Sequence, residues 1–143
     1  EGDGAVATTK RQTAMRHRQW LSHNESRLQM RRRFEEFFER FDIVLLPVMP
    51  CVAIHHDHSA PMAGRVVTTQ HGARPYWELN RWMAPAGACY LPATVIPVGL
   101  GATTGMPIGV QIVGPYLHDH TTLAFASALA ELVGPCPTPP GFA

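Results

Sequence analysis

The sequence predicts an α/β protein in which flanking helices cover a β-sheet, and three observations support this prediction. Two runs rich in Val and Ile, 94–98 and 108–113, have the composition of strands that are buried on both faces. Apolar side chains recur at helical spacing within 22–40. A second amphipathic pattern of the same kind covers 119–133. We therefore expect strands packed against helices.

The two Val- and Ile-rich runs are joined by a connection, 99–107, whose residues favour turns. Glycine supplies positive φ angles and proline starts turns, so this segment is suited to reversing the chain. The turn-forming residues are Gly99, Gly101, Gly105 and Pro107. The sequence therefore predicts two neighbouring antiparallel strands.

Length, charge and cysteine content bound the class of protein. The chain has 143 residues, enough for one domain with a core, and its net charge of +1 gives no field that favours nucleic acid or membrane. We find no apolar run of the roughly 18–20 residues that a spanning helix needs, and no apolar secretory signal at the N-terminus. The three cysteines, Cys51, Cys89 and Cys136, have no CxxC spacing, so we expect reduced thiols in a cytoplasmic protein.

Charge is distributed unevenly along the chain. All 12 basic residues lie at or before Arg81, and the only acidic residues beyond it are Asp119 and Glu131. A domain of this size that faced water on all sides would carry charge along its whole length. We therefore expect the C-terminal half to be buried, or covered by something outside this chain.

The N-terminal part predicts two helices. Residues 1–9 are small and polar and are expected to be disordered, and a first helix is predicted over about 10–21. A capping box formed by Ser22 and Glu25 then predicts a second helix that runs to about residue 40. Its apolar stripe consists of Met30, Phe34, Phe37, Phe38 and Phe41.

The opposite face of the second helix is charged. Opposite charges four residues apart predict three ion pairs: Arg31–Glu35, Arg32–Glu36 and Glu36–Arg40. The arginine triplet 31–33 also raises nucleic-acid binding as an alternative. Because three glutamates follow within six residues, we favour a solvated and paired face.

The middle of the chain predicts a strand, a loop and a short helix. The run 43–48 after Asp42 is a buried strand, and 51–75 has no clear period. A metal site is an alternative for this loop, because it holds His55, His56, Asp57, His58 and His71. The spacing lacks the pattern of a zinc site, so we favour an exposed polar loop. A helical segment over 76–84 is expected to end at Pro85 and Gly87.

The C-terminal helix is predicted to begin with Asp119 as its N-cap and to end before the pair Gly134-Pro135. Its inner stripe is predicted from Leu123, Ala126, Ala130 and Val133, widened by Phe125 and Leu129.

The residues needed for chemistry are sparse. Lysine occurs once, at Lys10, and none of the serines lies in a glycine-rich elbow or beside an orienting base. The serines are Ser22, Ser26, Ser59 and Ser127. Cys51 and Cys89 lie in apolar surroundings typical of inert thiols. No phosphate-binding loop or dinucleotide fingerprint is present, so the residues alone predict no self-contained active site, no cofactor and no metal.

Four segments together resemble the C-terminal part of amidase signature enzymes. They are FDIVLLPVMP (41–50), LPATVIPVG (91–99), GMPIGVQIVGP (105–115) and the helix DHTTLAFASALAEL (119–132). No single segment is decisive, but their order and spacing are specific as a set. The resemblance implies part of the mixed β-sheet of an amidase signature fold, with residues 10–143 as the C-terminal portion of an amidase domain.

The resemblance also implies an activity that this chain does not carry alone. Members of the family hydrolyse amide C–N bonds through a Ser–cis-Ser–Lys triad in a Gly/Ser-rich signature, which is absent here. We therefore assign no catalytic residue. The expected partner is the remainder of the amidase chain, and exposed apolar surface on the isolated piece could also support a homo-oligomer.

Four residues are candidates for the wall of a substrate pocket. Met49 and Pro50 end a predicted strand, and Trp77 and Trp82 precede the LPA segment. Ordinary packing is the alternative for these four. Gln111 is expected to serve structure by bonding to backbone near its strand.

One segment departs from the family pattern. Many relatives have Asn-x-x-Gly near the acyl pocket, where this chain has 87–90 with the bulky Tyr90 at the end. The substrate therefore stays open.

Two other classes of function remain as alternatives to an amidase portion. One is a non-catalytic binding or structural module, such as a piece of an amidotransferase subunit. The other is a metal-dependent protein that uses the histidines of 55–58.

Overall fold

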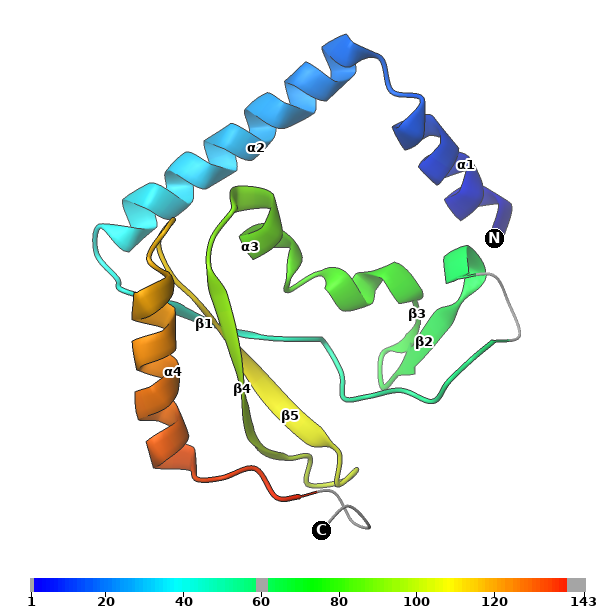
Figure 1. Cartoon of the computed structure of the whole chain (residues 1–143). Coiled ribbons are helices and arrows are strands. Elements are labelled where there is room, and N and C mark those ends of the chain that lie inside the picture. Colours follow the sequence, from blue (N-terminus) through cyan, green and yellow to red (C-terminus); the bar gives the residue numbers. More distant parts are fainter. Residues whose placement is uncertain (1, 59–61, 139–143) are drawn as a thin grey trace.

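The computed structural model describes residues 2–58 and 62–138, in which helices surround a small antiparallel sheet and a separate hairpin (Figure 1). The helices are α1 (Gly2–Thr13), α2 (His17–Phe38), η1 (Met62–Gly64), η2 (Tyr76–Asn80), α3 (Ala84–Cys89) and α4 (Asp119–Val133). The strands are β1 (Val44–Pro47), β2 (Val66–Thr69), β3 (Gly72–Pro75), β4 (Ala93–Leu100) and β5 (Pro107–Val113). The α/β class predicted from the sequence is confirmed.

The three-stranded sheet has the order β1-β5-β4, and both of its pairings are antiparallel. The predicted strand pair is therefore confirmed as β4 and β5, and the predicted strand after Asp42 is β1. Their predicted burial is found only at the end of β5, because β1 and β4 contain no buried residue. The register shifts between Pro97 and Gly99, where Gly99 has a φ of 147°. A residue without a Cβ is needed for that conformation, which explains one of the glycines of the connection.

The end of the sheet near Val113 is covered on both faces. One face meets α2 and α3 in a core cluster that buries Ala86, Cys89, Leu91 and Val113. Met30, Phe34 and Phe38 of α2 and Val44 and Leu46 of β1 pack against this cluster. Three members of the predicted apolar stripe therefore pack as expected, whereas Phe41 is exposed.

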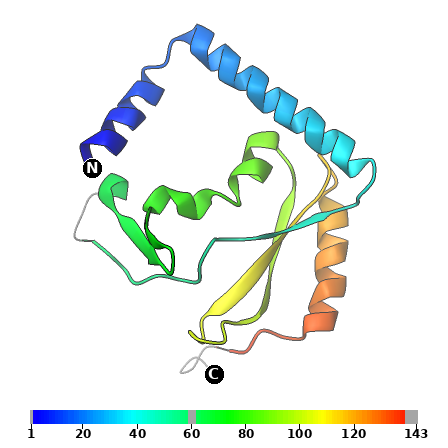
Figure 2. The same ribbon diagram turned by 180° about the vertical axis from the view of Figure 1, so that it is seen from behind.

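Helix α4 covers β4 and β5, and it lies beside these strands in both views (Figure 2). Thr94 donates a 2.9 Å hydrogen bond from its hydroxyl to the hydroxyl of Thr122, which in turn donates to the carbonyl oxygen of Asp119 at 2.8 Å. The close approach requires Gly114, because a Cβ there would lie 2.7 Å from Cγ2 of Thr122.

The inner face of α4 matches the prediction in part, because Phe125, Ala126 and Leu129 are partly or fully buried as expected. Thr122 and Ala126 are buried, whereas Leu123 is half-exposed and Ala130 and Val133 are also exposed. The buried face of α4 is therefore rotated by about one residue from the predicted apolar stripe. The hydroxyl of Thr122 on this face hydrogen-bonds to Thr94 of the sheet and to the carbonyl oxygen of Asp119. The helix also begins one residue earlier than predicted, with His118 at the N-cap and Asp119 in the first turn.

The N-terminal prediction needs three corrections. Residues 2–9, expected to be disordered, belong to helix α1, and Glu1 lies outside the described residues. The break between the first two helices falls before His17, not at Ser22. The predicted capping box of Ser22 and Glu25 is therefore wrong, and Oε1 of Gln19 instead accepts from the backbone N–H of Arg16 at 3.1 Å.

The charged face of α2 matches the prediction in part. The predicted pair Arg31–Glu35 is confirmed, with Nε and Oε1 3.2 Å apart. Arg32 pairs with Glu25 at 3.6 Å, and not with Glu36. The guanidinium of Arg31 also lies 4.0 Å from the centre of the Tyr116 ring. A face expected to be solvated therefore also helps attach α2 to the rest of the molecule.

The segment expected to be a polar loop, 51–75, contains the hairpin β2–β3. The helix predicted over 76–84 is a 3₁₀ turn, η2, followed by α3 with Pro85 in its first turn. Pro85 therefore starts a helix here, because the first turn lacks intrahelical donors and tolerates proline. Helix α3 ends at Cys89, and its C-cap residue Tyr90 has a φ of 59°. The guanidinium of Arg27 lies over the Tyr90 ring, 4.7 Å from its centre.

The other end of the sheet is open. Along β5 the burial rises from exposed at Pro107 and Ile108 to fully buried at Ile112 and Val113. Leu100, which pairs with Pro107, is half-exposed at this end. Leu45 and Val95 are also half-exposed, although they pair with Ile112 and Gln111 nearer the covered end. Among the described residues, none of the helices is both long and apolar enough to cross a membrane.

Candidate functional site

A cavity of about 620 Å³ lies between the hairpin β2–β3, η2 and the segment that follows β1, and we call it the hairpin pocket. Its apolar wall includes Pro50, Leu79 and Trp82, and Leu79 is only 6% exposed. Its polar side includes His71, Arg74, Glu78 and Arg81. The pocket therefore combines an apolar interior with a charged side, as small-molecule sites do.

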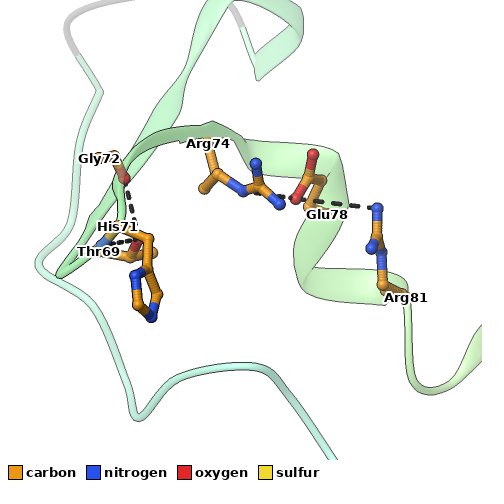
Figure 3. Close-up of polar contacts among 6 residues, drawn as sticks. All are labelled: Thr69, His71, Gly72, Arg74, Glu78 and Arg81. Atoms are coloured by element: carbon orange, nitrogen blue, oxygen red, sulfur yellow. Dashed lines mark hydrogen bonds and ion pairs between the residues drawn. The ribbon is translucent and has the colours of Figure 1, made fainter.

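The charged side is a row of three side chains, in which Glu78 lies between two arginines (Figure 3). Nε of Arg74 lies 3.1 Å from Oε2 of Glu78, and Nη2 of Arg81 lies 4.0 Å from the same oxygen. One carboxylate thus faces two guanidinium groups, and the row has a net charge of +1.

The hairpin turn holds this row in place. The hydroxyl of Thr69 donates to the carbonyl oxygen of Gly72 at 2.9 Å and accepts from the backbone N–H of His71 at 3.1 Å (Figure 3). Gly72 has a φ of 100°, a conformation that side chains rarely adopt. The turn therefore fixes the start of β3, and with it the position of Arg74.

The wall of the pocket is tied to the sheet by Gln111. Its Nε2 donates a 3.1 Å hydrogen bond to the backbone carbonyl oxygen of Trp82, and the side chain is buried. This contact confirms the prediction that Gln111 bonds to backbone, although the partner lies in another segment and not near its own strand. It also links β5 to the segment between η2 and α3.

The structure brings together some of the residues predicted to form a substrate pocket. Pro50 and Trp82 both line the hairpin pocket. Met49 and Pro50 line a second cavity of about 480 Å³ at the open end of the sheet, against Val95 and Ile108. Trp77 is 51% exposed and borders neither of these two cavities.

The histidine-rich segment borders a third cavity of about 400 Å³, together with Arg65 and Tyr76. The rings of His56 and His58 lie 6.0 Å apart. Within residues 2–58 and 62–138, no group of three His, Cys, Asp or Glu side chains has the arrangement to hold a metal ion. The geometry therefore does not favour the metal-dependent alternative.

Among the described lysine, serine and cysteine side chains, one lines the hairpin pocket. Lys10, Ser22, Ser26 and Ser127 are exposed on helices, and Ser59 lies outside the described residues. Cys51 lines the pocket and is partly buried.

Cys89 is fully buried in the core, and burial raises the pKa of its thiol above the ordinary value, although Arg27 and Arg31 oppose this shift. A thiol with a raised pKa forms little thiolate, so Cys89 fits the predicted inert role.

Comparison with known proteins identifies the family. The amidase family model matches residues 5–123, which is most of the chain. The chain belongs to the amidase family. The resemblance to amidase signature enzymes seen in the sequence is thereby confirmed.

Curated relatives of this amidase-family chain differ in their named roles. It is 30% identical over 126 residues to the A subunit of a glutamyl-tRNA(Gln) amidotransferase of Anaeromyxobacter sp. (strain K), a match that covers 85% of this chain and 23% of that protein. It is 32% identical over 101 residues to a fatty acid amide hydrolase of Medicago truncatula, covering 71% of this chain and 16% of the relative. The chain thus spans about a fifth of the length of these relatives.

Solved structures share the fold. A crystal structure of an amidase superposes with a TM-score of 0.67 and 24% identity, covering 85% of this chain and 26% of that one. The A subunit of the glutamyl-tRNA(Gln) amidotransferase from Thermotoga maritima gives a TM-score of 0.67 at 20% identity, covering 88% of this chain and 25% of that one. The arrangement of sheet and helices is therefore that of amidases.

Sequence reasoning missed the charged row of the hairpin pocket. The run 65–75 has a local signal for a hairpin, because the β-branched residues of 66–69 precede a turn that contains Gly72. If a hairpin is predicted there, a turn follows its second strand. Arg74 and Glu78 then lie four positions apart and are candidates for an ion pair. The position of Pro50 and Trp82 beside them depends on tertiary packing.

Proposed function

We propose that this chain is the C-terminal portion of an amidase that hydrolyses carboxylic amide C–N bonds. The observation that carries the proposal is the match of the amidase family over residues 5–123, in a chain that spans about a fifth of its relatives. By the family resemblance, the mechanism is of the Ser–cis-Ser–Lys type, with the triad outside residues 1–143. The chain alone is then scaffold and pocket wall, and is inactive.

The proposed chemistry is acyl transfer in two steps. A serine oxygen attacks the amide carbonyl carbon, the C–N bond breaks, and the amine or ammonia leaves with a proton. Water then attacks the acyl-enzyme and releases the acid, with backbone donors stabilising the oxyanion in both steps. In this scheme Met49, Pro50, Trp77 and Trp82 contribute to substrate binding.

The remainder of the amidase is the proposed partner of this chain. Exposed apolar side chains on the sheet support this: Leu100 and Ile108 lie at its open end, and Leu45 and Val95 lie farther along the neighbouring strands. Such surface could also support a homo-oligomer in the isolated chain. We propose a cytoplasmic location, which the free thiols of the three cysteines support.

The experiment is an assay of ammonia and amine release from primary and N-substituted carboxamides. It compares the 143-residue chain with the complete polypeptide that contains it. We expect hydrolysis by the complete protein and none by the chain alone. Turnover by the purified chain, or its absence in the complete protein across the amide panel, would contradict the proposal.

A second candidate is a piece of the A subunit of an amidotransferase. It is favoured by the 30% identity to such a protein from Anaeromyxobacter sp. (strain K). The same assay separates the two, because a subunit functions together with other chains, so the complete polypeptide alone would then release little ammonia or amine.

A further inference from the structure

We propose that the hairpin pocket binds the carboxylate of an organic acid that has a short apolar body, through Arg74 and Arg81. This inference deepens the proposed function, on which it rests for its meaning. It assigns to the amidase substrates that carry a carboxylate in addition to the amide group.

The charge of the row is unbalanced within the described residues. A single oxygen, Oε2 of Glu78, faces both Nε of Arg74 and Nη2 of Arg81, at 3.1 and 4.0 Å. The 4.0 Å contact is too long for a hydrogen bond, so the donors of Arg81 are not engaged by Glu78. The N–H groups of Arg81 can therefore donate hydrogen bonds to a second carboxylate beside Glu78.

The two guanidinium groups are accessible and oriented. The side chains of Arg74 and Arg81 are 52% and 65% exposed, whereas Glu78 between them is 31% exposed. A guanidinium presents several N–H donors in a planar fork that matches the two oxygens of a carboxylate. Glu78 orients Arg74, and its negative charge, which lies near both arginines, opposes the binding of a second carboxylate.

The apolar wall selects the remainder of the ligand. Pro50, Leu79 and Trp82 line the same cavity as the arginines, and its volume of about 620 Å³ fits a small organic molecule. The hydrogen bond from Gln111 to the carbonyl oxygen of Trp82 holds this wall against the sheet. An inorganic anion would use the arginines and leave this wall empty.

The test is calorimetric titration of hexanoate, with 1-hexanol as the uncharged probe of the same length. We expect saturable binding of hexanoate and at least about fivefold weaker binding of hexanol, because only the acid engages the guanidinium groups. Both the chain and the complete polypeptide are titrated. Equal affinity for the two probes, or no saturable binding of hexanoate to either protein, would overturn the proposal.

Two charge variants should change the affinity for hexanoate in opposite directions. Arg81→Gln should weaken hexanoate binding about fivefold or more, whereas Glu78→Gln should strengthen it about three- to fivefold, because the competing carboxylate is removed. Arg18→Gln on α2, which contributes no residue to the pocket, is the control and should change nothing. Circular dichroism checks that each variant folds.

A surface ion pair without a ligand role would give no change with Glu78→Gln, and that result would also contradict the proposal. Binding is measured without turnover, so its failure is separate from a failure of amide hydrolysis.

Discussion

The two ends of β5 form the sharpest contrast in this molecule. At one end Ile112 and Val113 are 0% and 1% exposed, because α4 covers one face of the sheet and α2 with α3 covers the other. At the other end Ile108 is 40% exposed beside a cavity lined by Met49 and Pro50. One strand of apolar residues therefore ends in a finished core and begins on an uncovered surface.

The contrast shows that apolar composition and burial are separate properties. Both ends of β5 have the Val and Ile content of a buried strand, yet the chain's own helices reach only one of them. In the proposed amidase the open end is covered by the remainder of the polypeptide. The following predictions test this comparison, from the largest expected effect to the smallest.

Truncation of the same residue type at the two ends should have different costs. Ile112→Ala removes a fully buried side chain and should lower the free energy of unfolding of the chain by about 2–5 kcal/mol. Ile108→Ala, at an exposed position of the same strand, should cost less than about 1 kcal/mol. Urea denaturation of both variants measures the difference.

The same pair of variants in the complete polypeptide sharpens the comparison. If the remainder of the amidase covers the open end, the cost of Ile108→Ala should rise there. An unchanged cost would show that this surface stays uncovered.

Gly114→Ala should also destabilise the buried end. The new Cβ would lie 2.7 Å from Cγ2 of Thr122, whose hydroxyl is held by Thr94 and Asp119, so α4 must shift away from the sheet. We expect a loss of about 1–3 kcal/mol, measured by thermal or urea unfolding.

Gly87→Ala in α3 is the matched control for that variant, because a Cβ there meets nothing within 4 Å. Alanine at a helical position should be neutral or slightly stabilising. Similar losses for both glycines would mean that the contact with Thr122 does not limit the packing of α4.

The ionisation of the buried Cys89 should have a smaller effect on the free energy of unfolding. Burial raises the pKa of Cys89 above the ordinary thiol value of 9.0, so the native state keeps its proton at a pH where the unfolded chain loses it. The stability that this difference in pKa contributes is fully present below pH 9 and is lost as the pH rises above that value. The free energy of unfolding should therefore fall above pH 9. Urea titrations on both sides of that pH should show a decrease that Cys89→Ala removes.

Alkylation by iodoacetamide, followed by mass spectrometry, checks the same point without unfolding. Cys136 is exposed, Cys51 is partly buried beside the open end, and Cys89 is buried, so we expect modification in that order. Rapid modification of Cys89 would show that the core cluster opens readily.

Local patterns were sufficient for much of the fold. The strands β1, β4 and β5 follow from runs of Val, Ile and Leu bounded by glycine and proline, and the antiparallel pairing of β4 with β5 follows from the short connection. Helix α4 is predicted in extent, but its inner face is rotated because Thr122 hydrogen-bonds at the sheet. Apolar periodicity does not register such a polar contact.

The candidate site depended more on tertiary structure. Pro50 and Trp82 were predicted as pocket residues because Pro50 follows a strand and Trp82 precedes the LPA segment. Both line the hairpin pocket in the structure. The charged row was not predicted, because the hairpin β2–β3 lies in a segment without a clear period. Trp77, predicted with the others, lies on the surface, since η2 is a short 3₁₀ turn with a different side-chain direction from an α-helix.

The sequence by itself determined the family, the α/β class and the strand pair, because motif order, turn residues and apolar runs are local properties of the chain. Tertiary structure alone decided which end of β5 is buried, which face of α4 meets the sheet and which arginines share the carboxylate of Glu78. These features depend on distances between residues far apart in the chain, and those distances are set only when the helices, the sheet and the hairpin pack together.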